Sequence, residues 1–141
     1  MSYTYEYPRP MLCVDIAIIA KDTKEILLIK RKNEPFQDFW ALPGGFLDMV
    51  ETLDNAAYRE LEEETAVKNI KLHRFKVYDE PKRDPRGRTI SMVYVGKEVK
   101  QNVFAKAGDD AAEAMFFSLN ALPNLAFDHN KIVQDIIKNH C

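Results

Sequence analysis

The sequence has little cysteine, no long apolar run and no excess of either charge. Its two cysteines, Cys13 and Cys141, are too few for a disulfide framework or a zinc site, and we expect free thiols in a reducing cytoplasm. The longest apolar candidate, residues 16–20, is far shorter than the roughly 20 residues of a membrane helix. The N-terminus has neither a basic start nor an apolar segment, unlike a secretory signal. These absences predict a cytoplasmic protein without a membrane partner.

The balance of charge excludes another class of protein. Twenty Lys and Arg residues stand against 22 Asp and Glu residues, which gives a net charge of −2. This balance does not favour binding to nucleic acid through bulk positive charge. The 141 residues are 46% hydrophobic and contain no repeat or Gly/Ser linker, so we expect one folded domain over residues 1–141.

The hydrophobic pattern predicts an α/β fold with a mixed sheet. Short segments rich in β-branched and aromatic residues predict strands at residues 11–20, 25–31, 71–78, 89–95 and near 114–117. The first two strands should form a hairpin, and Pro43-Gly44-Gly45 should interrupt regular structure. Apolar residues at three- and four-residue spacing predict a helix from Thr52, its N-cap, to about Ala66. A second helix is expected over residues 128–140.

A dense group of acidic side chains lies in the first of these helices. Between Glu51 and Glu64 the chain has six acids and a single base, Arg59. On a helix that advances about 100° per residue, Glu60, Glu63 and Glu64 fall on one side. A solvated helix face usually alternates charge, because like charges one turn apart repel. Since Mg²⁺ and similar ions prefer oxygen ligands, both a metal site and a solvated face stay open from the pattern alone.

The same segment carries a motif with fixed spacing. From Gly45 the pattern is Gly, five residues, Glu, seven residues, and then Arg-Glu-Leu-x-Glu-Glu-x-Ala-Val, which ends at Val67. This resembles the Nudix box of the Nudix hydrolases, and eight of its nine fixed positions agree. The departure is Ala66, where the family has a glycine that eases the exit from the helix. That glycine is not a ligand, so the departure concerns the local backbone.

The resemblance implies an α/β/α sandwich around a central mixed sheet, and it implies a role for each matching residue. Mg²⁺, or Mn²⁺ in its place, would be held by Glu60, Glu64 and the carbonyl of Gly44, with Glu63 as a ligand or a group acting through water. Arg59 and Glu51 would form an ion pair that braces the loop against the helix. A general base would come from the box or from a later acidic loop, whose candidates are Asp109, Asp110 and Glu113; a polar turn is the alternative interpretation of that loop.

Outside the box, the resemblance narrows to one branch of the family. Residues 84–89 (DPRGRT) and 125–129 (LAFDH) resemble bacterial and archaeal ADP-ribose pyrophosphatases and related domains of NAD metabolism. A guanidinium at Arg86 or Arg88 would suit a phosphate, with a solvated charged loop as the alternative. Trp40 could stack on adenine, or it could belong to the core or the pocket wall.

The resemblance therefore implies an enzyme that hydrolyses ADP-ribose to AMP and ribose 5-phosphate. Two alternatives stay open. The substrate could be another nucleoside diphosphate derivative or an oxidised nucleoside triphosphate, or the domain could sense ADP-ribose without cleaving it. The implied partner is a small nucleotide, and family members of this kind are often homodimers.

Overall fold

The first strand is apolar along both faces because it lies in the middle of the sheet. The computed structural model describes residues 2–108 and 110–140. In it, β1 (Met11–Ala20) pairs in parallel with β6 (Thr89–Glu98) along its whole length. β2 (Glu25–Arg31) folds back against the end of β1 as the predicted antiparallel hairpin. With neighbours on both edges and helices on both faces, most of β1 is withdrawn from water.

The other strands complete a mixed sheet. β5 (His73–Tyr78) pairs antiparallel with β6, and β7 (Ala111–Ser118) pairs antiparallel with β2. Two short strands, β3 (Trp40–Ala41) and β4 (Gly44–Phe46), bring the sheet to seven strands. Because β1 and β6 run in parallel while the other named pairs are antiparallel, the predicted mixed sheet is confirmed.

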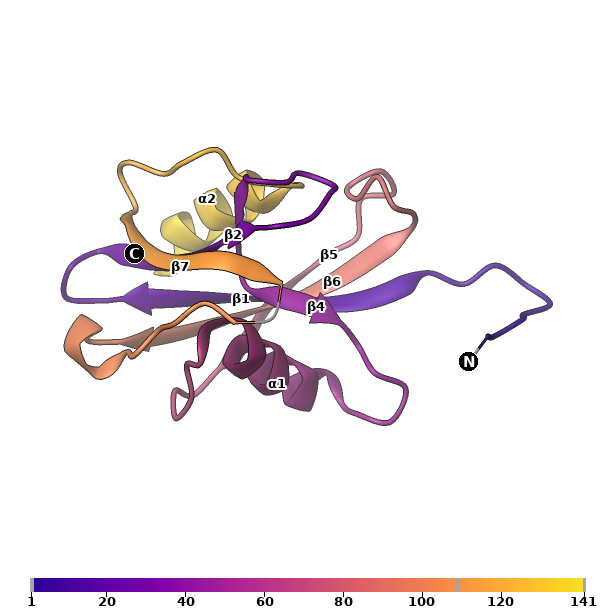
Figure 1. Cartoon of the computed structure of the whole chain (residues 1–141), viewed down its shortest axis with the longest axis horizontal. Helices are drawn as coiled ribbons and strands as arrows, with labels where there is room; N and C mark the ends of the chain where they lie inside the picture. Colours follow the sequence, from indigo (N-terminus) through magenta and orange to yellow (C-terminus); the bar gives the residue numbers. More distant parts are fainter. Residues whose placement is uncertain (1, 109, 141) are drawn as a thin grey trace.

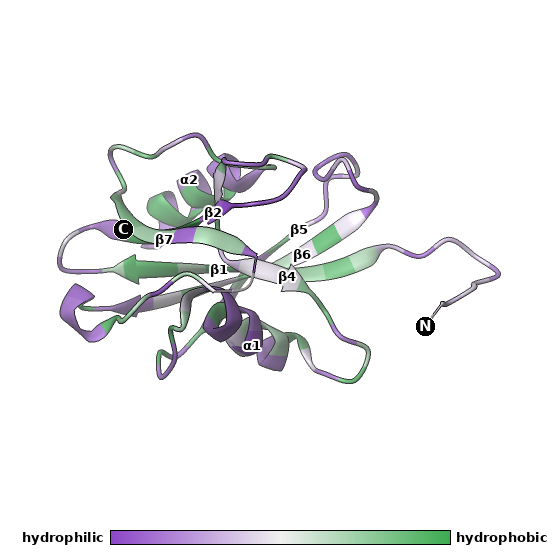
Figure 2. Ribbon diagram, in the orientation of Figure 1, coloured by the Kyte–Doolittle hydropathy of each residue, from purple (hydrophilic) through white to green (hydrophobic). Residues whose placement is uncertain are grey.

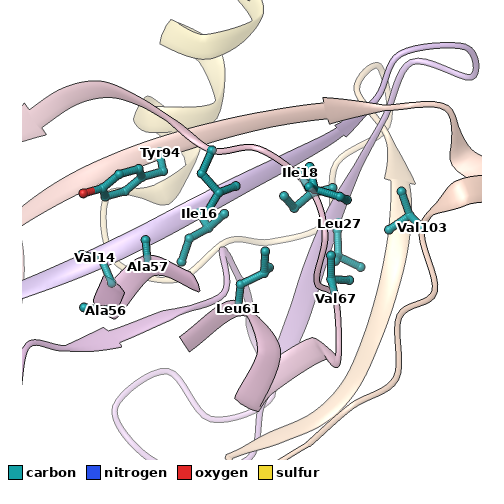
Figure 3. Close-up of a cluster of buried hydrophobic side chains, with 12 residues drawn as sticks. Val14, Ile16, Ile18, Leu27, Ala56, Ala57, Leu61, Val67, Tyr94 and Val103 are labelled. Carbon is teal, nitrogen blue, oxygen red and sulfur yellow. The ribbon is translucent and has the colours of Figure 1, made fainter. Parts of the chain in front are cut away.

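One helix covers each face of the sheet (Figure 1). α1 (Leu53–Thr65) packs on one face, where Leu61 joins a cluster with Val14, Ile16 and Ile18 of β1 (Figure 3). α2 (His129–His140) packs on the other face, and a short 3₁₀ turn, η1 (Lys100–Asn102), lies between β6 and β7. In Figure 2 β1 is hydrophobic where it lies between the helices, while much of α1 is hydrophilic. The predicted α/β/α sandwich is confirmed.

β1 and β2 stay paired only near their connecting turn and then separate. Farther along, β4 lies beside β1, and β3 lies beside β2. Residues 42 and 43 connect β3 to β4, so they cross the opening between the two halves of the sheet. The N–H of Ile16 in β1 donates to the carbonyl of Pro43 at 2.8 Å, which fixes this crossing segment. The opening is the place where side chains from distant parts of the chain meet.

The structure corrects the prediction for Pro43-Gly44-Gly45. We expected this segment to interrupt regular structure, but Gly44–Phe46 forms β4 and pairs with β1. A side chain at position 44 would collide with the carbonyl oxygen of Val14, so glycine is what allows this close pairing. β6 also continues to Glu98, beyond the predicted end.

The cysteines and the helices bear on the cellular predictions. Cys13 is a half-buried free thiol, and burial raises its pKa to about 12, so it stays protonated at neutral pH. Cys141 lies outside the described residues. In residues 2–108 and 110–140, none of the helices is long and apolar enough to cross a membrane. The cytoplasmic location stays a prediction.

Candidate active site

Helix α1 holds its acidic side chains in a fixed position because both of its ends are capped by hydrogen bonds. The N–H of Asn55 donates to Oγ1 of Thr52 at 3.1 Å, which confirms Thr52 as the N-cap. At the other end, Ala66 adopts the left-handed conformation with φ 62°, and its N–H donates to the carbonyl of Glu62. Ala57 and Leu61 are buried against the sheet, so the acidic flank of the helix is held beside the opening between β1 and β2.

A cavity of about 450 Å³ occupies this opening. One wall is acidic and comes mainly from α1, and the opposite wall is basic and aromatic. Its described lining includes Asp15, Arg31, Gly44, Gly45, Phe46, Glu60, Glu64, Arg83, Asp84, Arg86, Asp110, Phe127 and His129. The fold thus brings the predicted Glu60, Glu64, Gly44, Arg86 and Asp110 to one cavity.

Two glutamates of α1, Glu60 and Glu64, form the acidic wall. Burial raises the pKa of Glu64 to about 8, although the N–H of Gly44 donates to it at 3.3 Å; Glu60 and Asp15 add to the rise. Burial also raises the pKa of Glu60, against the lowering effect of Arg59. Both shifts have the sign expected where carboxylates are gathered away from water.

Glycine at position 45 allows the backbone to reach these acids. A side chain there would collide with the carboxylate of Glu60. The β4 backbone is therefore in close contact with the acidic wall, where the N–H of Gly44 also donates to Glu64.

Arg59 connects the loop before α1 to the acids of the helix. Its Nε and Nη2 bind the two oxygens of Glu51, at 2.9 and 2.5 Å. Its Nη1 donates to Glu60 at 2.7 Å and to Glu63 at 3.1 Å. The Arg59 guanidinium lowers the pKa of Glu51 to about 2. The expected ion pair is thus present in the geometry, and the carboxylate of Glu63, 43% exposed, is turned to Arg59 and does not line the cavity.

The donor set fits a divalent cation, although it is not a preformed cluster. Across the described part of the chain, no group of three His, Cys, Asp or Glu side chains stands in metal-ligating range of one point. Glu60 and Glu63 are instead paired with Arg59. Glu60, Glu64, Asp110 and the backbone of β4 still offer hard oxygen donors to one cavity, the chemistry that Mg²⁺ and Mn²⁺ prefer.

The opposite wall combines guanidinium groups with aromatic rings. The Cζ atoms of Arg31 and Arg86 lie 5.0 and 5.1 Å from the centre of the Phe127 ring, so this ring contacts two cations. Asp84 is buried and accepts from Nε and Nη2 of Arg86 at 3.0 and 2.8 Å. Burial and the neighbouring Arg86 lower the pKa of Arg31, which stays charged. This wall can receive an anionic, flat ligand.

A buried polar network forms part of the cavity lining, and sequence reasoning missed it. Oδ2 of Asp15 accepts from Ser91 at 2.6 Å, and the side chain of Arg83, only 3% exposed, binds both oxygens of Asp128 at 2.9 and 2.8 Å. Burial lowers the pKa of His129, which lies 3.5 Å from Asp15. The one available signal was Asp15 itself, the only charged residue in the apolar segment 11–20.

Several predicted residues lie elsewhere. The ring of Trp40 packs edge-on against Phe117, with 4.7 Å between ring centres, and takes part in the core on the α2 side. It is not in the described cavity lining, so the structure favours the core interpretation over adenine stacking. Arg88 is held outside the cavity, where it donates to the carbonyl of Asp79 at 2.6 Å.

The predicted acids of the late loop also lie in different places, one at the cavity and one away from it. Asp110 lies at the cavity, whereas Glu113 is half-exposed and pairs with Lys30 at 3.6 Å on the outside of the sheet. Asp109 lies outside the described residues, so its predicted role as a base stays a prediction.

The comparisons with known proteins agree with this geometry. A family model described as the NUDIX domain matches residues 9–136. The chain belongs to the Nudix family. Nudix hydrolases generally need a divalent metal ion, in keeping with the oxygen donors of the acidic wall.

Among the proteins that are similar over most of the chain, three illustrate the range. An ADP-ribose pyrophosphatase of Methanocaldococcus jannaschii is 50% identical over 132 residues, which are 94% of this chain and 76% of that protein. The ADPR responsive transcriptional repressor NtrR of Acinetobacter baylyi is 34% identical over 92% of this chain, which spans only 54% of the repressor. The NUDIX domain of Shewanella oneidensis NrtR, solved with ADP ribose, superposes with a TM-score of 0.86 at 26% identity, covering 96% of this chain and 91% of that one.

Proposed function

We propose that this Nudix protein hydrolyses the pyrophosphate bond of ADP-ribose and releases AMP and ribose 5-phosphate. One observation carries the proposal: a single cavity has an acidic wall from the Nudix box and, opposite it, a wall of arginine and aromatic side chains. Similarity to an ADP-ribose pyrophosphatase over 94% of the chain supports this choice of substrate. We take the metal to be Mg²⁺, with Mn²⁺ able to replace it, because the donors are hard oxygen atoms.

The acidic wall is assigned to the metal and the attacking water. Glu60, Glu64 and the carbonyl of Gly44 are the ligands in this proposal, and Glu63 acts at the edge of the site through water. A bound divalent ion would neutralise the pyrophosphate and lower the pKa of a coordinated water. Arg59 orients Glu60 and ties it to Glu51, which keeps the helix and its preceding loop in register.

The basic wall is assigned to the phosphate and ribose farther from the metal. Arg31 and Arg86 offer charge to phosphate oxygens, and Phe127 offers a flat apolar surface between them. Asp84 holds the Arg86 guanidinium in one orientation, so less side-chain entropy is lost on binding. Asp110, at the cavity rim, is the described candidate for a base from the late loop.

A panel of nucleotides tests the proposal. Purified protein with Mg²⁺ should cleave ADP-ribose with a higher kcat/KM than nucleotide sugars, dinucleotides or oxidised nucleoside triphosphates. Activity should be lost in EDTA and return with Mg²⁺ or Mn²⁺. Glu64→Gln should reduce kcat by about 100-fold or more while the protein still folds, since removing an essential charge-stabilising group costs on this order. A triphosphate cleaved faster than ADP-ribose would refute the substrate.

A sensing role is the second candidate, favoured by the similarity to an ADPR responsive repressor. A sensor would bind ADP-ribose without turnover. Retention of all four box glutamates and of Arg59 argues for catalysis. Calorimetry with ADP-ribose, followed by analysis of the recovered ligand, separates the two, because an enzyme returns AMP and a sensor returns intact ADP-ribose.

The homodimer and the cytoplasmic location stay predictions. Sedimentation of the purified protein would decide the oligomeric state. Cell fractionation would decide the location.

A further inference from the structure

We propose that His129 is a positioning residue for the metal-binding loop, holding Leu42 so that the backbone of Gly44 stays against Glu64. The backbone N–H of Leu42 donates to Nδ1 of His129 at 3.0 Å, across 87 residues of sequence. The imidazole is buried at the first turn of α2, on the far side of the crossing segment from α1. The inference rests on the proposed function, because it assigns a task beside the proposed ligands.

The hydrogen bond from Leu42 settles which nitrogen of the ring carries the proton. Nδ1 accepts from an N–H group, so it is unprotonated, and the neutral ring carries its hydrogen on Nε2. Nε2 faces Oδ1 of Asp15 at 3.5 Å, while Oδ2 of Asp15 accepts from Ser91 at 2.6 Å. The Leu42 hydrogen bond therefore sets the tautomer, and Asp15 places a carboxylate beside the protonated side of the ring.

The loop is tied at three successive residues. Leu42 donates to His129, the carbonyl of Pro43 accepts from Ile16 of β1, and the N–H of Gly44 donates to Glu64. Of these three ties, the first comes from α2, the second from the sheet and the third from α1. His129 thus links the helix on one face of the sheet to the proposed metal ligands beside the helix on the other face.

The ring is itself held against movement. Asp128, the preceding residue, is held by a bidentate ion pair with buried Arg83. Phe127 adopts a left-handed backbone with φ 53°, a conformation that is unfavourable for a residue with a side chain. Such a conformation persists where neighbouring contacts fix it, and it is common in binding sites. Residues 127–129 therefore place an aromatic wall, an ion pair and the Leu42 acceptor as one unit.

Metal affinity measured without substrate tests this role. Mn²⁺ binding to the full chain would be followed by electron paramagnetic resonance in wild type and in His129→Leu, His129→Asn and His129→Gln. Asn can place an oxygen near the position of Nδ1, whereas the longer Gln reaches toward Nε2. His73→Leu, an imidazole removed from exposed β5, is the matched control.

We expect His129→Leu and His129→Gln to weaken Mn²⁺ binding about 10-fold or more, the usual effect of removing a group that orients metal ligands. The Mn²⁺ affinity of His129→Asn should stay within about threefold of that of wild type. The affinity of His73→Leu should equal that of wild type. Should His129→Leu fail to fold, the difference between Asn and Gln decides. Equal affinities for Asn and Gln, or no Mn²⁺ binding by wild type, would overturn the inference. Wild type that binds Mn²⁺ but cleaves no nucleotide would instead overturn the proposed function, and the comparison of variants would still stand.

Discussion

At the scale of single residues, Glu64 links the stability of the protein to pH. Its pKa in the folded protein, raised by burial to about 8, exceeds its ordinary value of 4.5. The folded state therefore binds more protons than the unfolded state between these two values, and the free energy of unfolding should fall as pH rises from about 5 to 8. The slope from this group is at most about 1.4 kcal/mol per pH unit.

Urea unfolding in chelator measures this effect. Glu64→Gln should lack the slope from this group, and it should be more stable than wild type at pH 8 because its amide needs no ionisation. The N–H of Gly44 retains an acceptor in this variant. Parallel stability curves for the two proteins from pH 5 to 8 would show that Glu64 ionises normally in the fold.

Arg86 and Arg88, equal candidates in the sequence, should differ in their effect on substrate binding. Arg86 lines the cavity, and Arg88 is tied to a loop carbonyl outside it. Arg86→Ala should raise KM for ADP-ribose about 10-fold or more, because a charge-assisted hydrogen bond contributes roughly 1.5–3 kcal/mol. Arg88→Ala should stay within about twofold. Steady-state kinetics of both variants provide the comparison.

A further control concerns the ligand rather than the protein. A simple nucleoside triphosphate should lose less from Arg86→Ala than ADP-ribose does, because the basic wall is assigned to the second phosphate and its ribose. Equal losses for both nucleotides, or equal effects of the two variants, would contradict that assignment.

The residues of the site differ in how far sequence could predict them. Glu60, Glu64 and Arg59 lie in one helix, so local spacing was sufficient to place them. Asp15 and His129 gain their meaning from partners 76 and 87 residues away, Ser91 and Leu42, which a reading of local pattern cannot pair. Trp40 shows the opposite case, since an aromatic residue beside a glycine turn has the same local pattern in a core as in a pocket.

At the scale of secondary structure, the end of α1 carries removable strain. Ala66 takes the left-handed conformation with φ 62° and is exposed, at the position where the Nudix box has glycine. Ala66→Gly should stabilise the protein by about 1 kcal/mol in urea unfolding, because glycine adopts this conformation without steric cost. Activity should not change, since the side chain of residue 66 is outside the cavity lining.

Ala112→Gly provides the matched control for this substitution. Ala112 is also exposed but lies in β7 with an ordinary backbone, so glycine there should destabilise by about 0.5–1 kcal/mol. A loss of stability in both variants would mean that the exit from α1 is not strained.

The helices and strands could be predicted from the sequence wherever a segment had one clear hydrophobic period. The alternation and apolar runs predicted five strands, and the helical spacing predicted α1 and α2 to within a few residues. β3 and β4 escaped prediction because two and three residues are too short for any period. They exist because β1 and β2 separate and leave free edges, a consequence of tertiary structure that no local segment encodes.

At the scale of the whole molecule, the opening where β1 and β2 separate is the place where the two walls of the cavity meet. The acids reach the opening from α1 on one face, and residues 127–129 reach it at the start of α2 on the other. A ligand that contacts both walls therefore bridges parts of the chain that fold onto opposite faces of the sheet. Its binding should oppose unfolding of the entire domain.

Thermal unfolding with the proposed product tests this bridging. AMP and Mn²⁺ together, at about 100 times their dissociation constant, should add roughly 2.7 kcal/mol and raise Tm by about 5–10 °C. AMP in EDTA should raise Tm by much less, because the acidic wall then repels the phosphate. Glu64→Gln should lose most of the increase with Mn²⁺. If Tm rose by the same amount in Glu64→Gln, the nucleotide would bind elsewhere on the surface. A ligand bound between the two walls must bind more weakly when one wall loses a charge.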